Sequence, residues 1–216
     1  MKVAIYLFLG THQASPVYHY RTTSPERNCL DEKQLIQQAR GGSQAAWIEL
    51  VRLHQQALFR FAYLRMGDGD EAEDATQEAL IRAYRHLRRF DTGRPLRPWL
   101  FSILNRVASN RRRALGRYWS AVQRWAGEQV PTAAEPEVDG QRRLDQVSVW
   151  QAIQGLNAMD QSIIYLRYFL EFSVEESAQA LGIAEGTVKS RTSRALARLE
   201  VVIEKEFPGL IEGSTT

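Results

Sequence analysis

Apolar residues recur along this chain with a period close to that of an α-helix, and no segment alternates in the manner of a β-strand. In the first half, the predicted helices cover residues 31–40, a segment capped by Ser43 that ends before Gly67, residues 70–89, and residues 99–113. Glycine and prolines in "FDTGRPLRP" predict a loop before the last of these. The pattern therefore predicts an all-α fold whose first helices form one bundle.

The pattern weakens between Tyr118 and Gly140, where prolines, small residues and acids indicate an exposed linker. Helices are predicted beyond it over residues 141–155, 160–170 and 174–181, followed by a long one that starts after a glycine turn. We therefore expect two small helical domains joined by a flexible linker. The expected parts are an N-terminal extension (1–27), a first domain (28–117), the linker (118–140), a second domain (141–207) and a tail (208–216).

The second domain carries the spacing of a helix-turn-helix. Ser173 and Glu176 have the signature of a capping box, which sets the start of a short helix. Three later residues stand where the motif needs them: small Ala178 where the helices cross, Gly182 for a left-handed turn, and Val188 to pack the second helix on the first. The spacing therefore predicts this motif.

The second helix of the motif has an apolar side and a side rich in cations and small hydroxyls. At about 100° per residue, its apolar residues, from Val188 to Ile203, fall in one sector. A charged face on an isolated helix usually only solvates it, but within a helix-turn-helix such a face suits the major groove of DNA. The candidate DNA contacts of this helix are Thr187, Lys189, Ser190, Arg191, Ser193, Arg194 and Arg198.

Charge is distributed unevenly along a chain whose totals are ordinary. The 216 residues are 44% hydrophobic and 25% charged, with a formal net charge of +3, which fits a folded globular protein rather than a disordered one. Six acids and no base occupy residues 68–78, whereas residues 82–117 hold eleven arginines against the single Asp91. The placement of the charge therefore says more about partners than its sum does.

The arginine-rich stretch also carries aromatic side chains and an amide. Cations that hold phosphates, interleaved with rings on which bases stack, suit single-stranded or opened DNA. Asn105, beside Arg106, is placed to hydrogen-bond the edge of an extruded base. Trp99, Leu100 and Leu104 also fit core positions, which is the interpretation we favour for these three. The candidate contacts to opened DNA are Arg82, Phe90, Arg94, Trp99, Asn105, Arg106, Asn110, Arg111, Arg112 and Arg113.

Nothing in the sequence indicates catalysis, a metal site or a cofactor. The single cysteine excludes an internal disulfide and leaves a zinc site short of thiolates, which fits a reducing cytoplasm. The four histidines are scattered, and neither a phosphate-binding glycine loop nor a nucleophile elbow occurs. No apolar run reaches membrane-spanning length, so we expect no membrane insertion. Residues 1–27 are expected to be a loosely ordered extension, or to reflect a translation start placed too early.

Two motifs resemble regions of one known family, the extracytoplasmic function (ECF) group of bacterial RNA polymerase sigma factors. "AEDATQEALIRAYRHLRRFDTGRPLRPWLFSILNRVASNRRR" resembles sigma region 2, and "DQSIIYLRYFLEFSVEESAQALGIAEGTVKSRTSRALARL" resembles region 4. The resemblance covers about residues 30–205, in the correct order and with a linker between. It implies a non-enzymatic subunit that binds core polymerase, recognises the minus 35 and minus 10 promoter elements and helps to melt DNA.

The resemblance also implies roles for particular residues. Asp74, Gln77 and Glu78 in "DATQE" would contribute to docking on the clamp helices of the polymerase β′ subunit, and region 4 would also sit on the β flap. The asparagine matching Asn105 would line a pocket for a base flipped from the minus 10 element, completed by residues 107–113. The recognition-helix candidates would enter the minus 35 major groove. The family further implies an anti-sigma factor that holds the free protein.

Several positions depart from the usual pattern of the family. Asn157 follows Leu156 where the family usually has proline, and Ser177 stands where it usually has isoleucine. Thr192 and Ser193 replace a commoner pair of large apolar residues. We therefore expect an atypical sequence preference at the upstream promoter element.

Two other classes of protein fit parts of the sequence. A stand-alone helix-turn-helix regulator would bind duplex DNA as a dimer, with a sensor or dimerisation domain in its first half. The arginine-rich, aromatic segment around Asn105 speaks against this class, because a sensor has no need of it. A polymerase-binding adaptor that never touches DNA would leave both basic surfaces unexplained.

Overall fold

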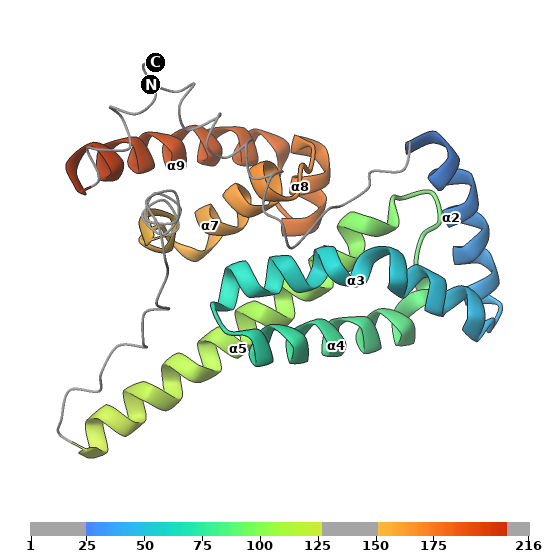
Figure 1. The fold of residues 1–216 in the computed structure, drawn as a ribbon, viewed down its shortest axis with the longest axis horizontal. Helices are drawn as coiled ribbons and strands as arrows, with labels where there is room; N and C mark the ends of the chain where they lie inside the picture. Colours follow the sequence, from blue (N-terminus) through green and yellow to red (C-terminus); the bar gives the residue numbers. More distant parts are fainter. Residues whose placement is uncertain (1–24, 127–150, 207–216) are drawn as a thin grey trace, which may run out of the picture.

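The computed structural model describes residues 25–126 and 151–206, and every regular element in these ranges is helical, which confirms the predicted all-α fold (Figure 1). The first range contains α2 (Pro25–Arg40), α3 (Gln44–Met66), α4 (Gly69–His86), the 3-10 turn η2 (Leu87–Arg89) and α5 (Leu96–Ala126). After a helical segment at residues 151–154, the second contains α7 (Ala158–Ile164), the π-helix η3 (Tyr165–Phe169), α8 (Val174–Leu181) and α9 (Glu185–Glu206). Most of the expected extension and linker, residues 141–150 and the tail lie outside the described residues.

Local capping signals set the ends of α3 and α4. The hydroxyl of Ser43 accepts a hydrogen bond from the backbone N–H of Ala46 at 3.3 Å, as predicted, and Gly67 ends α3 in the left-handed conformation, with φ 75°. Asp68 then caps α4 by accepting from the N–H of Glu71 at 2.8 Å. Ser43 and Asp68 each satisfy a donor that the first turn of a helix leaves without an intrahelical partner.

Several predicted boundaries differ from the structure. α2 begins at Pro25, earlier than expected. α5 begins at Leu96 and holds Pro98 in its first turn, although Pro98 was expected in the loop. Proline is tolerated there because the N–H groups of a first turn have no intrahelical partner. α5 also continues to Ala126, past the predicted linker start at Tyr118, and no glycine or proline lies between these two residues.

The helix expected over residues 160–170 is two elements. α7 starts at Ala158, and the side chain of Asn157 caps it by accepting from the N–H of Asp160 at 3.0 Å. Asn157 thus supplies a helix start at the position where proline is usual in the family that the chain resembles. From Tyr165 the backbone widens into η3, in which the N–H of Leu170 bonds to the carbonyl of Tyr165 at 3.1 Å.

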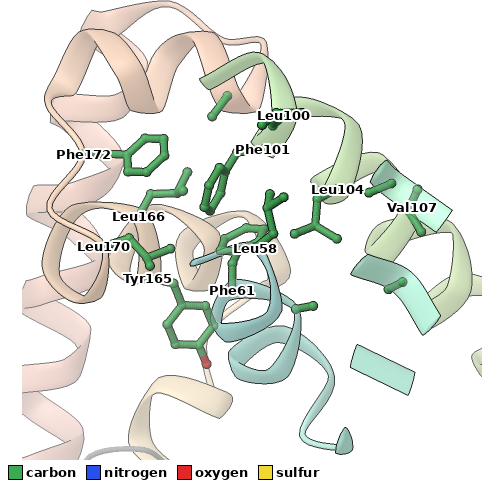
Figure 2. Packing of buried hydrophobic residues seen from close by; sticks show 14 of the residues in the cluster. Leu58, Phe61, Leu100, Phe101, Leu104, Val107, Tyr165, Leu166, Leu170 and Phe172 are labelled. Atoms are coloured by element: carbon green, nitrogen blue, oxygen red, sulfur yellow. The ribbon is translucent and has the colours of Figure 1, made fainter. Parts of the chain in front are cut away.

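Helices from both halves of the chain contribute to one hydrophobic core. The rings of Phe61 on α3 and Phe101 on α5 lie 5.5 Å apart, and Phe101 also meets Phe172, just before α8, at 4.7 Å. All three side chains are fully buried. Figure 2 shows Phe101 and Phe172 facing each other across the boundary between α5 and the second half. The two predicted domains are therefore packed against each other in this structure.

Candidate nucleic-acid interface

α8 and α9 form the predicted helix-turn-helix. The Ser173 hydroxyl accepts from the N–H of Glu176 at 3.0 Å, and the Glu176 carboxylate accepts from the N–H of Ser173 at 2.7 Å, so both bonds of the capping box are present. Gly182 ends α8 with φ 67°, in the left-handed region that glycine adopts at least cost. Ala178 and Val188 belong to one small buried cluster, which also contains Ile163 of α7. These contacts confirm the predicted motif.

Ser177 is accommodated inside this motif although serine is polar. Its side chain is fully buried, and its hydroxyl donates to the backbone carbonyl of Ser173 at 2.8 Å. A buried hydroxyl with a partner avoids the cost of an unsatisfied polar group. The motif therefore keeps its packing without the isoleucine that is usual at this position.

α9 divides into a buried face and an exposed face. Val188 and Ala195 are fully buried, and Leu199 is 1% exposed. The predicted DNA contacts on the outer side are Thr187, which is half-buried, and Lys189, Ser190, Ser193 and Arg194, which are exposed. Arg194 donates from Nε to the carbonyl of Ser190 at 3.2 Å, within its own helix. A row of donors along one face is therefore available to a partner.

Two other predicted DNA contacts, Arg191 and Arg198, bond to a buried carboxylate. Asp160 on α7 is 2% exposed. Its Oδ1 accepts from Nη1 of Arg191 at 2.9 Å, and its Oδ2 accepts from Nη1 of Arg198 at 2.8 Å. Asp160 was not among the site residues predicted from the sequence. The only local signal for it is its place three positions after Asn157, the residue that caps α7.

On α5, Asn105 keeps its side-chain oxygen inside the protein. Its Oδ1 is buried and has no hydrogen-bond partner among the residues that the structure describes. Buried polar atoms nearly always have a partner, so one without a partner calls for an explanation, such as a functional role. Arg106, the next residue, is exposed. Asn105, predicted to bind an extruded base, thus has a buried hydrogen-bond acceptor and lies next to a surface cation.

The residues predicted to bind polymerase gather around Arg111. Asp74, Gln77, Glu78 and Arg111 line one surface pocket together with neighbours on α4. Arg111 Nη1 lies 3.2 Å from a Glu71 oxygen and 3.5 Å from an Asp74 oxygen, and Nη2 lies 3.0 Å from a Glu78 oxygen. Partial burial opposes the charged form, but hydrogen bonds with Glu78 and then Glu71 outweigh it and raise the pKa of Arg111. In this structure Arg111 therefore binds α4.

The other cations predicted to hold opened DNA also bond to neighbouring side chains. The pairs are Arg82 with Glu78 at 2.5 Å, Arg94 with Asp91 at 3.5 Å, Arg112 with Gln161 at 3.1 Å, and Arg113 with Asn110 at 2.9 Å. All four side chains are exposed. Ion pairs at the surface, such as those of Arg82 and Arg94, contribute little stability, so a phosphate can replace their partners at low cost, whereas the partner of Arg112, Gln161, is fully buried.

The two aromatic residues predicted to contact opened DNA are more buried than these cations. Phe90 is 5% exposed and lies against the half-buried Trp99, with ring centroids 4.7 Å apart. Both rings belong to the core or pack against it. This arrangement agrees with the core interpretation of Trp99. In this structure the Phe90 ring also belongs to the core, where burial of an aromatic ring gains free energy, and its predicted contact with opened DNA stays a prediction.

A buried arginine links the two halves of the chain. Arg65 on α3 is 4% exposed, and its Nη1 donates to the carbonyl of Ala158 and, at 2.6 Å, to the hydroxyl of Ser162. Its Nη2 donates to the hydroxyl of Ser109 at 3.3 Å. Burial, and then the positive charge of Arg112, lower the pKa of Arg65 to about 10. The sequence did not predict this contact, which ties α7 to α3 and α5.

Among residues 25–126 and 151–206, no three His, Cys, Asp or Glu side chains gather where they could hold a metal ion. No helix in the same part of the chain combines the length and apolarity that crossing a bilayer requires. The described helices present a helix-turn-helix next to the helical bundle of the first half (Figure 1), and this bundle contains the arginine-rich stretch. Fold and surface together define an all-helical protein with a DNA-binding helix-turn-helix and a second basic domain.

Comparison with known families and proteins agrees with this class. A family model described as Sigma-70 region 2 matches residues 50–118, and one described as Sigma-70, region 4 matches residues 146–199. The ECF RNA polymerase sigma factor SigL of Mycobacterium tuberculosis is 33% identical over 169 residues, which cover 76% of this chain and 94% of SigL. SigW of Bacillus subtilis is 30% identical over 170 residues, 75% of this chain and 91% of SigW. The chain belongs to the ECF group of the sigma-70 family.

Two solved structures resemble the fold. RpoE of Bartonella quintana, in complex with the anti-sigma factor NepR, has a TM-score of 0.59 and 33% identity, covering 73% of this chain and 96% of that one. CnrH in complex with the cytosolic domain of CnrY has a TM-score of 0.62 and 26% identity, covering 82% and 99%. As a member of this family, the chain is a non-enzymatic transcription initiation factor, and sigma factors bind core RNA polymerase.

Proposed function

We propose that this sigma factor holds one promoter at two places: it reads the minus 35 element as duplex with α9 and captures an unpaired base of the minus 10 element near Asn105. The observation that carries the proposal is the exposed row of Lys189, Ser190, Ser193 and Arg194 on a helix whose opposite face is buried. A helix held in this way can enter a groove without losing its packing.

At the upstream element, the N-terminal half of α9 lies in the major groove. The second helix of a helix-turn-helix contacts base edges through residues near its start, where Thr187, Lys189 and Ser190 stand. The planar guanidinium of Arg194 can make a bidentate contact with guanine, and the hydroxyls can bond to phosphates or bases. Because Thr192 and Ser193 are not large apolar residues, the sequence preference there is expected to be atypical.

At the downstream element, Asn105 binds the edge of a base that has left the stack. When the Asn105 side chain turns toward the base, Oδ1 accepts from an exocyclic amine, which supplies the partner that this oxygen lacks among the described residues. Unstacking costs about a few kcal/mol per step. Phosphate contacts by exposed Arg106, Arg112 and Arg113 offset this cost.

Polymerase binding uses the acidic end of α4. Asp74, Gln77 and Glu78 share a pocket with Ile81, whose side chain is 52% exposed, so charged and apolar contacts are available at one place. We assign this surface to the clamp helices of the β′ subunit, and a further contact of region 4 to the β flap. RpoE and CnrH were each solved with a second protein, NepR or CnrY. We propose that an anti-sigma factor likewise holds this chain in the cytoplasm.

The two domains must separate when both promoter elements are bound. Elements named minus 35 and minus 10 lie about 25 base pairs apart, or roughly 85 Å of B-form DNA. The compact arrangement cannot span this length, because Phe101 contacts Phe172 and Arg65 bonds to Ser162. Arg97 adds a further contact, since Nη2 donates to the carbonyl of Leu170 at 2.6 Å. Promoter binding therefore breaks the contacts between the domains.

The test is run-off transcription with purified core polymerase and a promoter identified by mapping transcript starts after overproduction of the protein. Arg194→Ala is expected to weaken promoter binding upstream, and Asn105→Ala to reduce strand opening without preventing duplex binding. Two matched controls remove cations outside the proposed contacts: Lys205→Ala on α9 and Arg52→Ala on α3. Both side chains are exposed, so both variants should initiate normally. Normal initiation by Asn105→Ala and Arg194→Ala would show that these residue assignments are wrong.

A further inference from the structure

The carboxylate of Asp160 joins two helices at the edge of the DNA-reading surface. It lies on α7, whereas both of its arginine partners lie on α9. Asn157 adds a third bond, with Nδ2 donating to Asp160 Oδ2 at 2.7 Å. A carboxylate that is 2% exposed is stable in its charged form only when its oxygens have donors, and here each oxygen has an arginine.

Arg191 and Arg198 are spaced to lie on the same side of α9. Seven residues make nearly two helical turns, which places the two side chains about 10 Å apart along the axis. Each gives one Nη1 atom to Asp160, and their side chains remain 36% and 53% exposed. An arginine has five N–H donors, so both guanidinium groups keep donors for a partner at the surface.

These two arginines differ from Arg194, which donates to the carbonyl and the hydroxyl of Ser190 on its own helix. A long side chain that is free to rotate loses conformational entropy when DNA orders it, whereas one that is already held loses less. Arg191, Arg198 and Asp160 together carry a net charge of only about +1, because Asp160 cancels one of the two positive charges. The contribution of Asp160 to binding is therefore orientation rather than charge.

We propose that Asp160 is a positioning residue that fixes Arg191 and Arg198 as a pair of phosphate contacts beside the α9 face that reads the bases. The proposal rests on the proposed function of α9 and deepens it. It assigns Arg191 and Arg198 to the DNA backbone and leaves sequence reading to Lys189, Ser190 and Arg194. Phosphate contacts set the register of a protein on DNA and carry no sequence information themselves.

The test compares Asp160→Asn with wild type in the reconstituted holoenzyme, on a duplex that carries the mapped upstream element and on a shuffled copy. The amide keeps the size of the side chain but offers one acceptor in place of two. Because the substitution makes the protein more positive, charge alone predicts equal or tighter DNA binding. Orientation predicts the opposite, a loss of about fivefold or more on both duplexes. Glu200→Gln, which removes an acid from α9 itself, is the matched control and should bind as tightly as wild type or more tightly.

Further variants separate positioning from a purely structural role. Arg191→Lys with Arg198→Lys keeps both charges but loses the planar fork, and should reproduce the loss. Adding Asp160→Asn to this variant should change the affinity no further, because the orienting contact is already gone. Melting temperatures for each variant establish that the protein is folded at the temperature of the binding assay.

The outcomes distinguish this inference from the proposed function. The inference is overturned if folded Asp160→Asn loses less than fivefold in DNA affinity or binds more tightly than wild type. It is also overturned if Asp160→Asn lowers the affinity of the double lysine variant by as much as it lowers that of wild type. If wild type and Arg194→Ala bind both duplexes equally, the role proposed for α9 fails instead. If Arg194→Ala changes base preference while Asp160→Asn has no effect, only the positioning role is wrong.

Discussion

The contact between Phe101 and Phe172 gives a direct test of whether the two domains pack against each other in solution. Both side chains are fully buried, and their rings meet edge to face, with centroids 4.7 Å apart and planes at 60°. Replacing either ring by leucine keeps an apolar side chain and costs about 1–2 kcal/mol of unfolding free energy. The edge-to-face pair adds about 0.5–1.5 kcal/mol that either substitution alone removes. The double variant should therefore lose less unfolding free energy than the sum of the losses in the two single variants, and the difference should be about 0.5–1.5 kcal/mol.

Urea unfolding followed by far-UV circular dichroism measures this coupling. Wild type, Phe101→Leu, Phe172→Leu and the double variant form the thermodynamic cycle, and one cooperative transition is expected for each. Phe101→Leu combined with Val201→Ala is the control, because the Val201 side chain is 62% exposed on α9. The effects in this control should add within about 0.5 kcal/mol.

Additivity at Phe101 and Phe172 within the same error would refute the reasoning, because touching rings must be coupled. Two separate unfolding transitions in wild type would refute it independently. Either result would mean that the domains are apart in the free protein. The contacts of Arg65 and Arg97 across the same boundary would then not form in solution.

Three further predictions concern local features. Ser173→Ala removes one bond of the capping box and should lower the unfolding free energy by about 1 kcal/mol in urea titration, whereas an equal value in the variant would exclude the cap. Gly182→Ala should lower the unfolding free energy by about 1–2 kcal/mol in the same assay. The backbone φ of 67° alone causes this loss, because no atom lies within 4 Å of an added Cβ. An unchanged unfolding free energy would contradict the left-handed turn. Burial raises the pKa of the Tyr165 phenol, so the folded protein holds this proton while the unfolded chain releases it near pH 10, and stability falls as the pH rises through that value. Tyr165→Phe should therefore make the fall in unfolding free energy between about pH 9 and pH 11 shallower, and an unchanged slope would contradict the raised pKa.

Features with local signals could be predicted from the sequence. The bounds of α8 agree with the prediction because Ser173, Glu176 and Gly182 act on the backbone within a few residues. The buried sector of α9 agrees because helical periodicity is itself a local property. The end of α5 could not be predicted in the same way, since prolines beyond residue 126 suggested an earlier break.

Contacts between distant residues could not be predicted. Helical periodicity placed Arg191 and Arg198 beside the exposed face of α9 but gave no sign of their partner, because Asp160 belongs to another helix. Arg111 likewise follows the pattern of a surface cation, yet it binds Glu71 and Glu78 on α4. In each case the partner is set by how helices pack, which a periodic pattern does not encode.

Run-off transcription on altered promoters tests the central claim most directly. Wild-type protein with purified core polymerase should start transcripts at the mapped position. Scrambling either the upstream or the downstream element should abolish these starts, because α9 and the surface around Asn105 each read one of them. Starts that survive scrambling of either element would contradict the account. So would a failure to join core polymerase, both by the full chain and by a variant that lacks residues 1–27.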